Sequence, residues 1–178
     1  MGGGLKLNTI YLVGFMGCGK TSVGRELSKR LEVPPYDVDS TVEKDRGQTI
    51  REIFKNEGEE AFRNYESLAI RQLPVQHAVV MTGGGAVVRE ENITYMKNNG
   101  IVIYLKTSFP VLWSRLMTEE ERNKRPILLT STREEVQKLF NDRSSHYEKS
   151  DIEVITDQLT TEEVCDQILE KLSRLNIQ

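Results

Sequence analysis

The chain has 178 residues, of which 38% are hydrophobic and 29% are charged, as is usual for one globular domain with a sizeable core. Its net charge of -3 does not show the excess of positive charge that is typical of nucleic-acid-binding proteins. No apolar run approaches the roughly 20 residues of a membrane span, and the start of the chain has no hydrophobic region typical of a secretion signal. We therefore expect a cytoplasmic protein that binds neither nucleic acid nor a membrane.

The first predicted element is a strand over residues 9–13, followed by a glycine-rich sequence and a helix-compatible segment at 22–31. Residues 14–21 read Gly-Phe-Met-Gly-Cys-Gly-Lys-Thr and satisfy G-x-x-x-x-G-K-[ST]. A strand, a glycine-rich turn and a helix are the context that a P-loop requires. The sequence therefore predicts a site for nucleotide phosphates.

In such a loop, backbone N–H groups and the positive end of the helix bind phosphate oxygens. Lys20 is expected to reach the β- and γ-phosphates, and the Thr21 hydroxyl to coordinate Mg²⁺. A P-loop alone does not distinguish a kinase from a GTPase or a motor ATPase. The predicted nucleotide-binding residues of the loop, for ATP if the protein is a kinase, are Gly14, Gly17, Cys18, Gly19, Lys20, Thr21 and Ser22.

The two cysteines, Cys18 and Cys165, form no CxxC pair, and two histidines complete no zinc-type cluster. This usage favours a reduced setting. We interpret Cys18 as a small residue that fills a tight loop rather than as a redox switch, because thiol reactivity needs a lowered pKa.

Asp37 and Asp39 follow Pro34-Pro35-Tyr36, about where a second strand should end. Alternate side chains of a strand point to opposite faces, but at the end of a strand the chain turns and two carboxylates can converge. One could hold Mg²⁺ through water, and the other could orient an acceptor hydroxyl and take its proton. The alternative is a solvated turn, in which Asp is common.

Further strand-like runs lie at 78–82, 101–105 and 152–155, with helix-like segments between them. This alternation predicts a parallel sheet with helices on its faces. The runs at 9–13, 78–82 and 101–105 are almost continuously apolar, as in strands covered on both faces. The run at 152–155 is less so, and we place it at an edge.

The closing helix begins at a capping box, Thr160-Thr161-Glu162-Glu163. An apolar stripe follows at spacings of three and four and predicts one buried face. Its members are Val164, Ile168, Leu172 and Leu175.

Two charged stretches, at about 39–72 and about 118–129, look inserted into the alternating pattern. A charge run is usually a solvated face. Phosphoryl transfer must also be shielded from water, however, and a polar mobile lid commonly does this.

Two more patterns are weak alone. Arg63 and Glu66 suit a surface pair on a helix, which contributes little energy. Gly83-Gly84-Gly85 fits a turn, and it is not a dinucleotide loop because Val88 stands where G-x-G-x-x-G needs its third glycine.

Taken together, the motifs resemble those of shikimate kinases in the nucleoside-monophosphate-kinase-like group, over residues 9–172. The ordered set is specific, although each part alone is not. It comprises the P-loop at 14–21, Asp37-x-Asp39, Phe62-Arg63-x-x-Glu66, Gly83-Gly84-Gly85, Arg125-Pro126, and Arg143 with Tyr147.

The resemblance implies a P-loop kinase of the three-layer α/β/α type, with a central five-stranded parallel sheet. Residues 1–178 would form a single domain in which 39–72 is the substrate-binding insert and 118–129 is the lid. It further implies a monomeric, cytoplasmic enzyme that uses Mg²⁺ and transfers the γ-phosphoryl group of ATP to the 3-hydroxyl of shikimate.

The resemblance also assigns roles to residues. Asp37 would hold the water shell of Mg²⁺, Asp39 would bind and orient the substrate hydroxyls, and Arg125 would close over the transferring phosphoryl group as a catalytic and ATP-binding residue. Arg63, which Glu66 orients, and Arg143 would pair with the substrate carboxylate. Backbone N–H groups of Gly83, Gly84 and Gly85 would contact a substrate hydroxyl, and Phe54 and Phe62 would line the pocket.

One departure concerns adenine. The family carries an arginine some seven residues before the Arg-Pro pair, where this chain has Thr118 between Arg115 and Arg122. Which of the two arginines replaces it, if either does, is left open. Two rival functions also stay open, namely a gluconate or nucleotide kinase on the same fold and a nucleotide-binding module that has lost catalysis.

Overall fold

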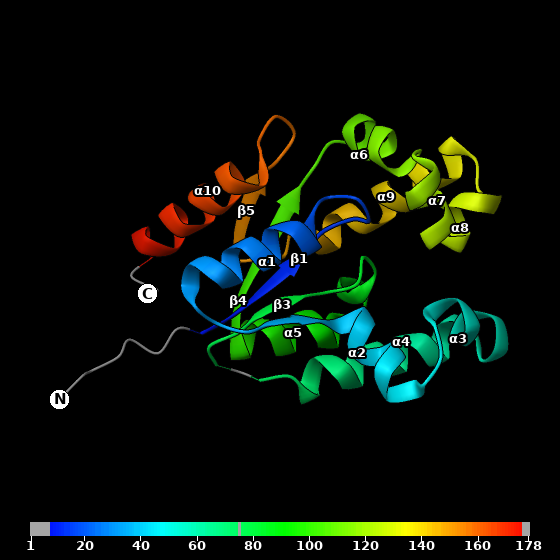
Figure 1. The fold of residues 1–178 in the computed structure, drawn as a ribbon, viewed down its shortest axis with the longest axis horizontal. Coiled ribbons are helices and arrows are strands. Elements are labelled where there is room, and N and C mark those ends of the chain that lie inside the picture. The colour runs from blue at the N-terminus through cyan, green and yellow to red at the C-terminus, as the bar shows by residue number, and fades with distance from the viewer. Residues whose placement is uncertain (1–7, 75, 176–178) are drawn as a thin grey trace.

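The structure, a computed structural model, describes residues 8–74 and 76–175, and within them it forms a five-stranded parallel sheet (Figure 1). The strand order is β2-β3-β1-β4-β5, which confirms the predicted sheet. The last strand lies at an edge, as expected from its weaker apolar pattern. The strands are β1 (Thr9–Val13), β2 (Pro35–Asp37), β3 (Val79–Met81), β4 (Gly100–Lys106) and β5 (Ile152–Ile155).

Helices cover both faces of this sheet, which gives the three-layer α/β/α arrangement (Figure 1). Helices α1 and α10 pack against each other, while α5 packs against β4. The helices are α1 (Lys20–Leu31), α2 (Val38–Arg46), α3 (Ile50–Asn56), α4 (Gly58–Gln72), α5 (Glu90–Asn99), α6 (Phe109–Leu116), α7 (Glu119–Lys124), α8 (Pro126–Thr130), α9 (Arg133–Tyr147) and α10 (Thr161–Arg174), with a 3-10 turn, η1 (Ala86–Val88). None of the described helices is both long and apolar enough to span a membrane.

Local sequence signals set several helix ends. The predicted capping box of α10 is present, since the Thr160 side chain accepts from the Glu163 backbone and the Glu163 carboxylate accepts from Thr160. One prediction for this helix is wrong. Leu175 lies beyond the last helical residue, and 51% of its surface is exposed, so it is not part of the buried stripe.

The two central strands carry the site. Strands β1 and β3 are buried along their whole length and pair with Leu12 opposite Met81. Because parallel strands end at the same edge of a sheet, the segments that follow β1 and β3 lie side by side. A further hydrogen bond, from the Thr82 backbone N–H to the Leu12 carbonyl at 3.1 Å, continues this pairing past the last ladder residue.

The two charged stretches are helical. Helices α2, α3 and α4 cover most of residues 39–72, and α7 and α8 cover most of residues 118–129 (Figure 1). Both groups lie toward the end of the molecule at which β1 and β3 end, on the right of Figure 1. The two charged stretches, predicted as a substrate-binding insert and a lid, therefore flank the same edge of the sheet.

Candidate active site

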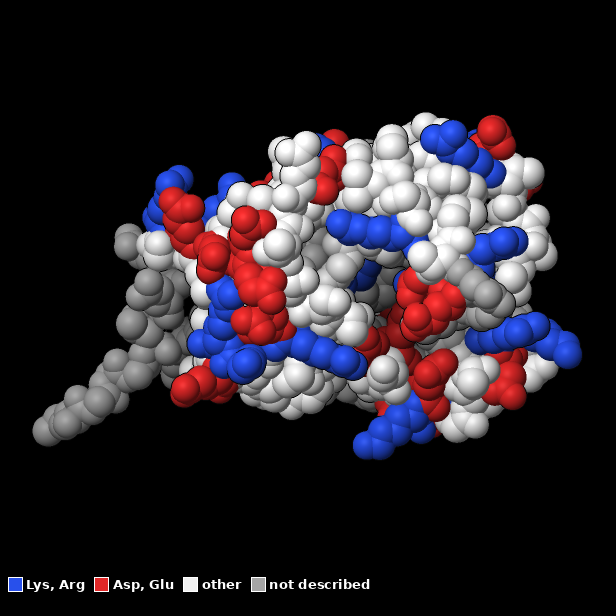
Figure 2. Space-filling model, turned by 45° about the horizontal axis from the view of Figure 1, so that its top comes forward, with Lys and Arg blue, Asp and Glu red and all other residues white. Residues whose placement is uncertain are grey.

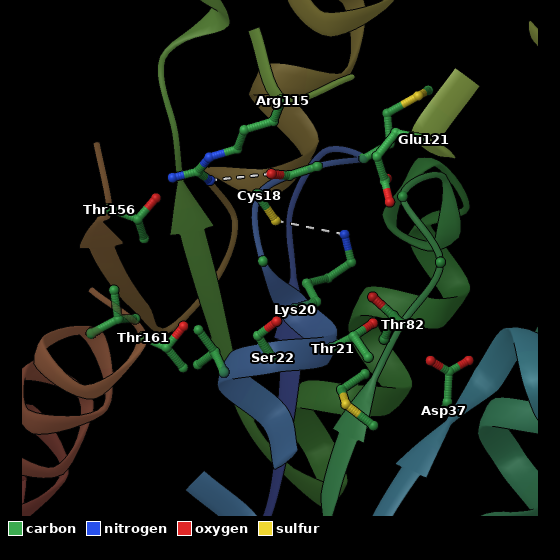
Figure 3. Close-up of a pocket in the computed structure, with 18 of the residues that line it drawn as sticks. Cys18, Lys20, Thr21, Ser22, Asp37, Thr82, Arg115, Glu121, Thr156 and Thr161 are labelled. Atoms are coloured by element: carbon green, nitrogen blue, oxygen red, sulfur yellow. Dashed lines mark hydrogen bonds between the residues drawn. The ribbon is translucent and has the colours of Figure 1, made fainter. Parts of the chain in front are cut away.

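A cavity of about 460 Å³ lies at this edge, between the P-loop, the ends of β2 and β3, the lid and the start of α10. Figure 2 shows the corresponding hollow, with both basic and acidic side chains around its rim. Figure 3 shows Lys20 near its middle, with Asp37 and Thr82 on one side and Thr156 and Thr161 on the other. The residues that line the cavity therefore come from several elements that are distant in sequence.

The P-loop has the backbone geometry that its glycines predict. Gly17 and Gly19 adopt φ values of 81° and 98°, a region that a β-carbon disfavours. Helix α1 starts directly after Gly19, has no side-chain cap from the described residues and has no acidic residue in its first turn. Its first N–H groups are thus left for an external anion, in a field that favours negative charge.

Lys20 is folded back on this loop. Its ammonium donates to the carbonyl oxygens of Gly14 at 2.6 Å and Phe15 at 3.2 Å, and lies 3.6 Å from the Cys18 sulfur (Figure 3). Thr21 and Ser22 also line the cavity. A charged donor whose partners among residues 8–74 and 76–175 are backbone carbonyls and a sulfur can turn toward phosphate oxygens, which are stronger acceptors.

Cys18 lines the cavity, but only 2% of its surface is exposed. A β-carbon on Gly14 would lie 2.7 Å from the Cys18 sulfur, so the thiol occupies the space beside that glycine. This packing supports the interpretation of Cys18 as a residue that fills a tight loop. Both cysteines are free and buried.

The two carboxylates at the end of β2 do converge on the cavity. Asp37 caps α2, because its Oδ1 accepts from the Ser40 backbone N–H at 2.9 Å. Asp39 lies in the first turn of the same helix, and its Oδ1 is buried with no hydrogen-bond partner among the described residues. Burial, together with the charges of Glu66 and Asp37, raises the pKa of Asp39 to about 7.

Arg63 and Glu66 are not an exposed surface pair. Glu66 is fully buried, and its Oε2 accepts from the Arg63 guanidinium at 2.8 Å, while Glu59 lies 3.3 Å from the other nitrogen. Burial raises the pKa of Glu66, and Arg63 counteracts part of that rise. A buried carboxylate of this kind fixes its partner, because breaking the pair would leave it uncompensated.

The segment Gly83-Gly84-Gly85 brings these groups together. A β-carbon on Gly83 would lie 2.4 Å from Glu66 Oε1 and 2.8 Å from Asp39 Oδ1, so both carboxylates approach the same point of the backbone. Gly83 and Gly84 line the cavity, whereas Arg63, Gly85 and Arg143 lie beside it.

Helix α9 closes the other side of the glycine segment. The Tyr147 hydroxyl donates to the Gly84 carbonyl. A β-carbon on Gly84 would lie 3.8 Å from Nη1 of Arg143, whose guanidinium also sits 5.9 Å from the centre of the Phe15 ring. The structure thus gathers Asp39, Arg63 and Arg143 around three consecutive glycines.

The lid contributes Glu121 and Arg125, which line the cavity and form an ion pair with each other. Arg115 also lines the cavity, and its guanidinium donates to the Gly17 carbonyl at 3.2 Å (Figure 3). Arg122 is exposed and is not among the lining residues. The structure therefore favours Arg115 of the two arginines that the sequence left open.

The rings of Phe54 and Phe62 lie 4.9 Å apart, but neither is among the residues that line the cavity. Phe62 is buried, and Phe54 is 39% exposed. Their predicted place in the substrate pocket stays a prediction.

Sequence reasoning did not assign to the site the residues at the far end of the cavity, which come from the connection after β5 and from the first turn of α10. They are Thr156, Leu159, Thr161 and Val164. The position of Thr156 directly after β5 is a signal that could have identified this end of the cavity. Ligands of open parallel sheets bind beyond the carboxyl ends of the strands.

A nucleotide-type loop, a lid and a second cluster of charged groups on one parallel sheet define the class of P-loop kinases that act on small molecules. The shikimate kinase family model matches residues 16–173. The chain is 39% identical over 172 residues to a shikimate kinase of Thermodesulfovibrio yellowstonii, with 96% of this chain and 98% of that protein covered. It is 37% identical over 167 residues to one of Bacillus mycoides, with 94% and 99% covered.

Among solved structures, the fold is similar to that of a shikimate kinase from Acinetobacter baumannii in complex with shikimate. The TM-score is 0.88 at 33% identity, with 97% of this chain and 96% of that chain covered. The chain belongs to the shikimate kinase family, whose members are ATP-dependent enzymes that phosphorylate a hydroxyl of shikimate.

Proposed function

We propose that this chain transfers the γ-phosphoryl group of ATP to the 3-hydroxyl of shikimate, giving shikimate 3-phosphate and ADP. One observation carries the proposal. A single cavity runs from the ammonium of Lys20 to the buried, unpaired oxygen of Asp39, and two arginines lie beside the Asp39 end. That arrangement suits a phosphoryl donor at one end and a hydroxylated carboxylate at the other.

The phosphates of ATP would bind the N–H groups of the P-loop and the start of α1, with Lys20 turning from its loop carbonyls to the β- and γ-phosphates. The base would lie between Arg115 and the residues that precede and begin α10, which line the opposite end of the cavity. Arg125 would leave Glu121 and bind the γ-phosphate when the lid closes.

The donors at the centre of the cavity fit Mg²⁺. The Thr21 hydroxyl and the Asp37 carboxylate are hard oxygen ligands, and Mg²⁺ usually takes one or two such groups together with substrate phosphates and water. Asp37 is also held in place, because the Ser40 backbone N–H binds one of its oxygens. When bound, Mg²⁺ would neutralise charge on the phosphates.

Shikimate would bind where the insert, the glycine segment and α9 meet. Arg63 and Arg143 would pair with its carboxylate, since a planar guanidinium matches a carboxylate well. The N–H groups of Gly83, Gly84 and Gly85 would contact a ring hydroxyl.

In the reaction, the oxygen of the 3-hydroxyl attacks the γ-phosphorus as the bond to the bridging oxygen of ADP breaks. The proton of the hydroxyl passes to the Asp39 carboxylate. Because phosphoryl transfer depends mainly on positioning and on neutralising charge, Lys20 and Arg125 supply most of what the protein contributes.

All these groups come from one chain, which supports activity as a monomer. A cytoplasmic setting, where ATP is abundant and thiols stay reduced, agrees with two free cysteines.

The direct test is release of ADP from Mg·ATP, with shikimate compared against gluconate, quinate and AMP. Rapid release with shikimate alone is expected. Turnover on another acceptor instead would keep the phosphoryl-transfer site and overturn the roles of Arg63 and Arg143. Nucleotide binding without turnover on any acceptor would favour the non-catalytic module.

Replacing Arg63 with alanine is expected to raise the KM for shikimate by about 10- to 100-fold, because one charge-assisted contact is lost. The KM for ATP should change little. Steady-state kinetics with each substrate varied in turn would check this, with Arg46→Ala as a control, since Arg46 is an exposed residue that packs on Tyr65. An unchanged KM for shikimate would contradict the carboxylate anchor.

Replacing Arg115 with alanine is expected to raise the KM for ATP by about 5- to 20-fold, because Arg115 both lines the cavity and holds the Gly17 carbonyl of the P-loop. The matched variant Arg122→Ala, on the next helix, α7, should leave this KM close to that of the unchanged enzyme. The opposite pattern in these two variants would show that Arg122 is the arginine that contacts the nucleotide.

A further inference from the structure

Gly85 lies against the guanidinium of Arg63. A β-carbon at position 85 would be 2.4 Å from Nη2, and 2.6 Å from both Cζ and Nη1, of that side chain. The backbone conformation does not explain the glycine, because its φ of -106° is open to any residue. The close approach of the guanidinium is what leaves no room for a side chain here.

Arg63 is not free to move aside. Only 12% of its side chain is exposed, and the guanidinium is held by Glu66 at 2.8 Å and by Glu59 at 3.3 Å. It also lies 5.1 Å from the centre of the Phe62 ring. Because Glu66 is fully buried, a displaced guanidinium would leave a buried carboxylate without its partner, which is strongly unfavourable.

The glycine segment is equally fixed. The Tyr147 hydroxyl holds the Gly84 carbonyl from α9. The Ala86 backbone N–H donates to the Gly83 carbonyl at 3.2 Å, and the Val88 N–H donates to that of Gly85 at 3.1 Å. The guanidinium therefore sits between a rigid turn on one side and a buried carboxylate on another.

We propose that Gly85 is a positioning residue for Arg63. The guanidinium packs against the backbone of Gly85, and this packing fixes the orientation in which the guanidinium faces the substrate carboxylate. This role is additional to the N–H group that Gly85 would donate to a substrate hydroxyl, which alanine would retain. It rests on the proposed function, in which Arg63 anchors shikimate. A guanidinium can accept a carboxylate through two parallel hydrogen bonds only in one plane, so its orientation limits binding.

The expected result for Gly85→Ala is a rise of about tenfold in the KM for shikimate, since a misaligned guanidinium keeps its charge and loses the two-point contact. The KM for ATP should stay within about twofold, and kcat at saturating shikimate should fall less than kcat/KM. A general loss of structure would change all three quantities.

The deciding measurement is a double-mutant cycle of Gly85→Ala and Arg63→Ala, because a residue that acts through another has no further effect once the other is removed. Gly85→Ala is expected to change the KM for shikimate about tenfold when Arg63 is present and less than twofold when it is replaced. Val88→Ala, an exposed change three residues further on in the same turn, should not affect either background.

Equal effects of Gly85→Ala in both backgrounds would overturn the proposal, because a side chain at position 85 would then affect substrate binding without acting through Arg63. If Gly85→Ala does not fold, the double variant decides the matter. Recovery of folding in the double variant supports the proposal. Failure of the double variant to fold under conditions in which Arg63→Ala alone folds contradicts it.

The thermal midpoints of the same four proteins separate this proposal from the proposed function. If Arg63→Ala leaves the KM for shikimate unchanged, the anchor role of Arg63 fails. If Gly85 still packs on Arg63, Gly85→Ala should then lower the thermal midpoint when Arg63 is present and leave it unchanged when Arg63 is replaced. In that case Gly85 would affect stability but would position no substrate contact.

Discussion

Replacing Lys20 with methionine is expected to lower kcat by about 1,000-fold or more. Lys20 is the cation that the P-loop itself supplies, and its ammonium lies within 3.2 Å of two loop carbonyls at the point where β- and γ-phosphates would bind. Methionine keeps most of the length of the side chain but removes the charge that stabilises the transferring phosphoryl group. Single-turnover measurements with saturating ATP and shikimate would report the chemical step.

The control for this change is Lys29→Met, an exposed lysine in the last turn of the same helix. It removes the same charge from the same helix at the end that is remote from the cavity, and kcat should stay within about twofold. The loss expected for Lys20 therefore tests position rather than net charge. Turnover of the Lys20 variant within about tenfold of the unchanged enzyme would contradict its role in transfer.

The parts of the fold that the sequence predicts well are those whose cause is local. Strands 9–13 and 101–105 are almost continuously apolar because helices cover both faces of the sheet, and this pattern is visible without any tertiary contact. The capping box at Thr160 and the P-loop glycines are likewise fixed by a few neighbouring residues. Leu175 was misplaced because its spacing fits the stripe, although the helix ends one residue earlier.

The candidate site could be predicted only in part. Asp37 and Asp39 stand two positions apart and share one helix start, so their convergence follows from the local chain. The burial of Glu66, the position of Arg115 against Gly17 and the approach of Gly85 to Arg63 depend on contacts between distant elements. Such contacts leave no periodic pattern in a single sequence.

Replacing Asp39 with asparagine is expected to lower kcat by about 100- to 10,000-fold, because the amide cannot take the proton of the attacking hydroxyl. The shape of the side chain is nearly preserved, so nucleotide binding should remain. Steady-state assays with saturating shikimate, together with a fluorescent nucleotide-binding assay, would measure both. Asp45→Asn, an exposed change on the same helix, is the control and should leave both properties unchanged.

The same substitution is expected to raise the thermal midpoint of the ligand-free, Mg²⁺-free protein above neutral pH. Burial and the neighbouring carboxylates raise the pKa of Asp39 to about 7, so the folded protein binds a proton there more tightly than the unfolded chain does. The free-energy penalty of the raised pKa is therefore complete above about pH 7, shrinks as the pH falls, and disappears only below about pH 4, where the unfolded chain also holds this proton. The gain in thermal midpoint from asparagine should be a few degrees and nearly constant above about pH 8, should be smaller near about pH 5, and should vanish toward about pH 4.

The two readouts together distinguish a functional carboxylate from a structural one. Replacing a residue that stabilises the fold lowers the thermal midpoint of the protein. Replacing a carboxylate that is held unpaired for chemistry lowers the activity and raises the midpoint. A lower midpoint at every pH would mean that Asp39 holds the start of α2, and near-normal turnover would remove it as the proton acceptor. A midpoint gain that does not change between about pH 5 and 9 would show that its burial, rather than its charge, carries the energetic effect.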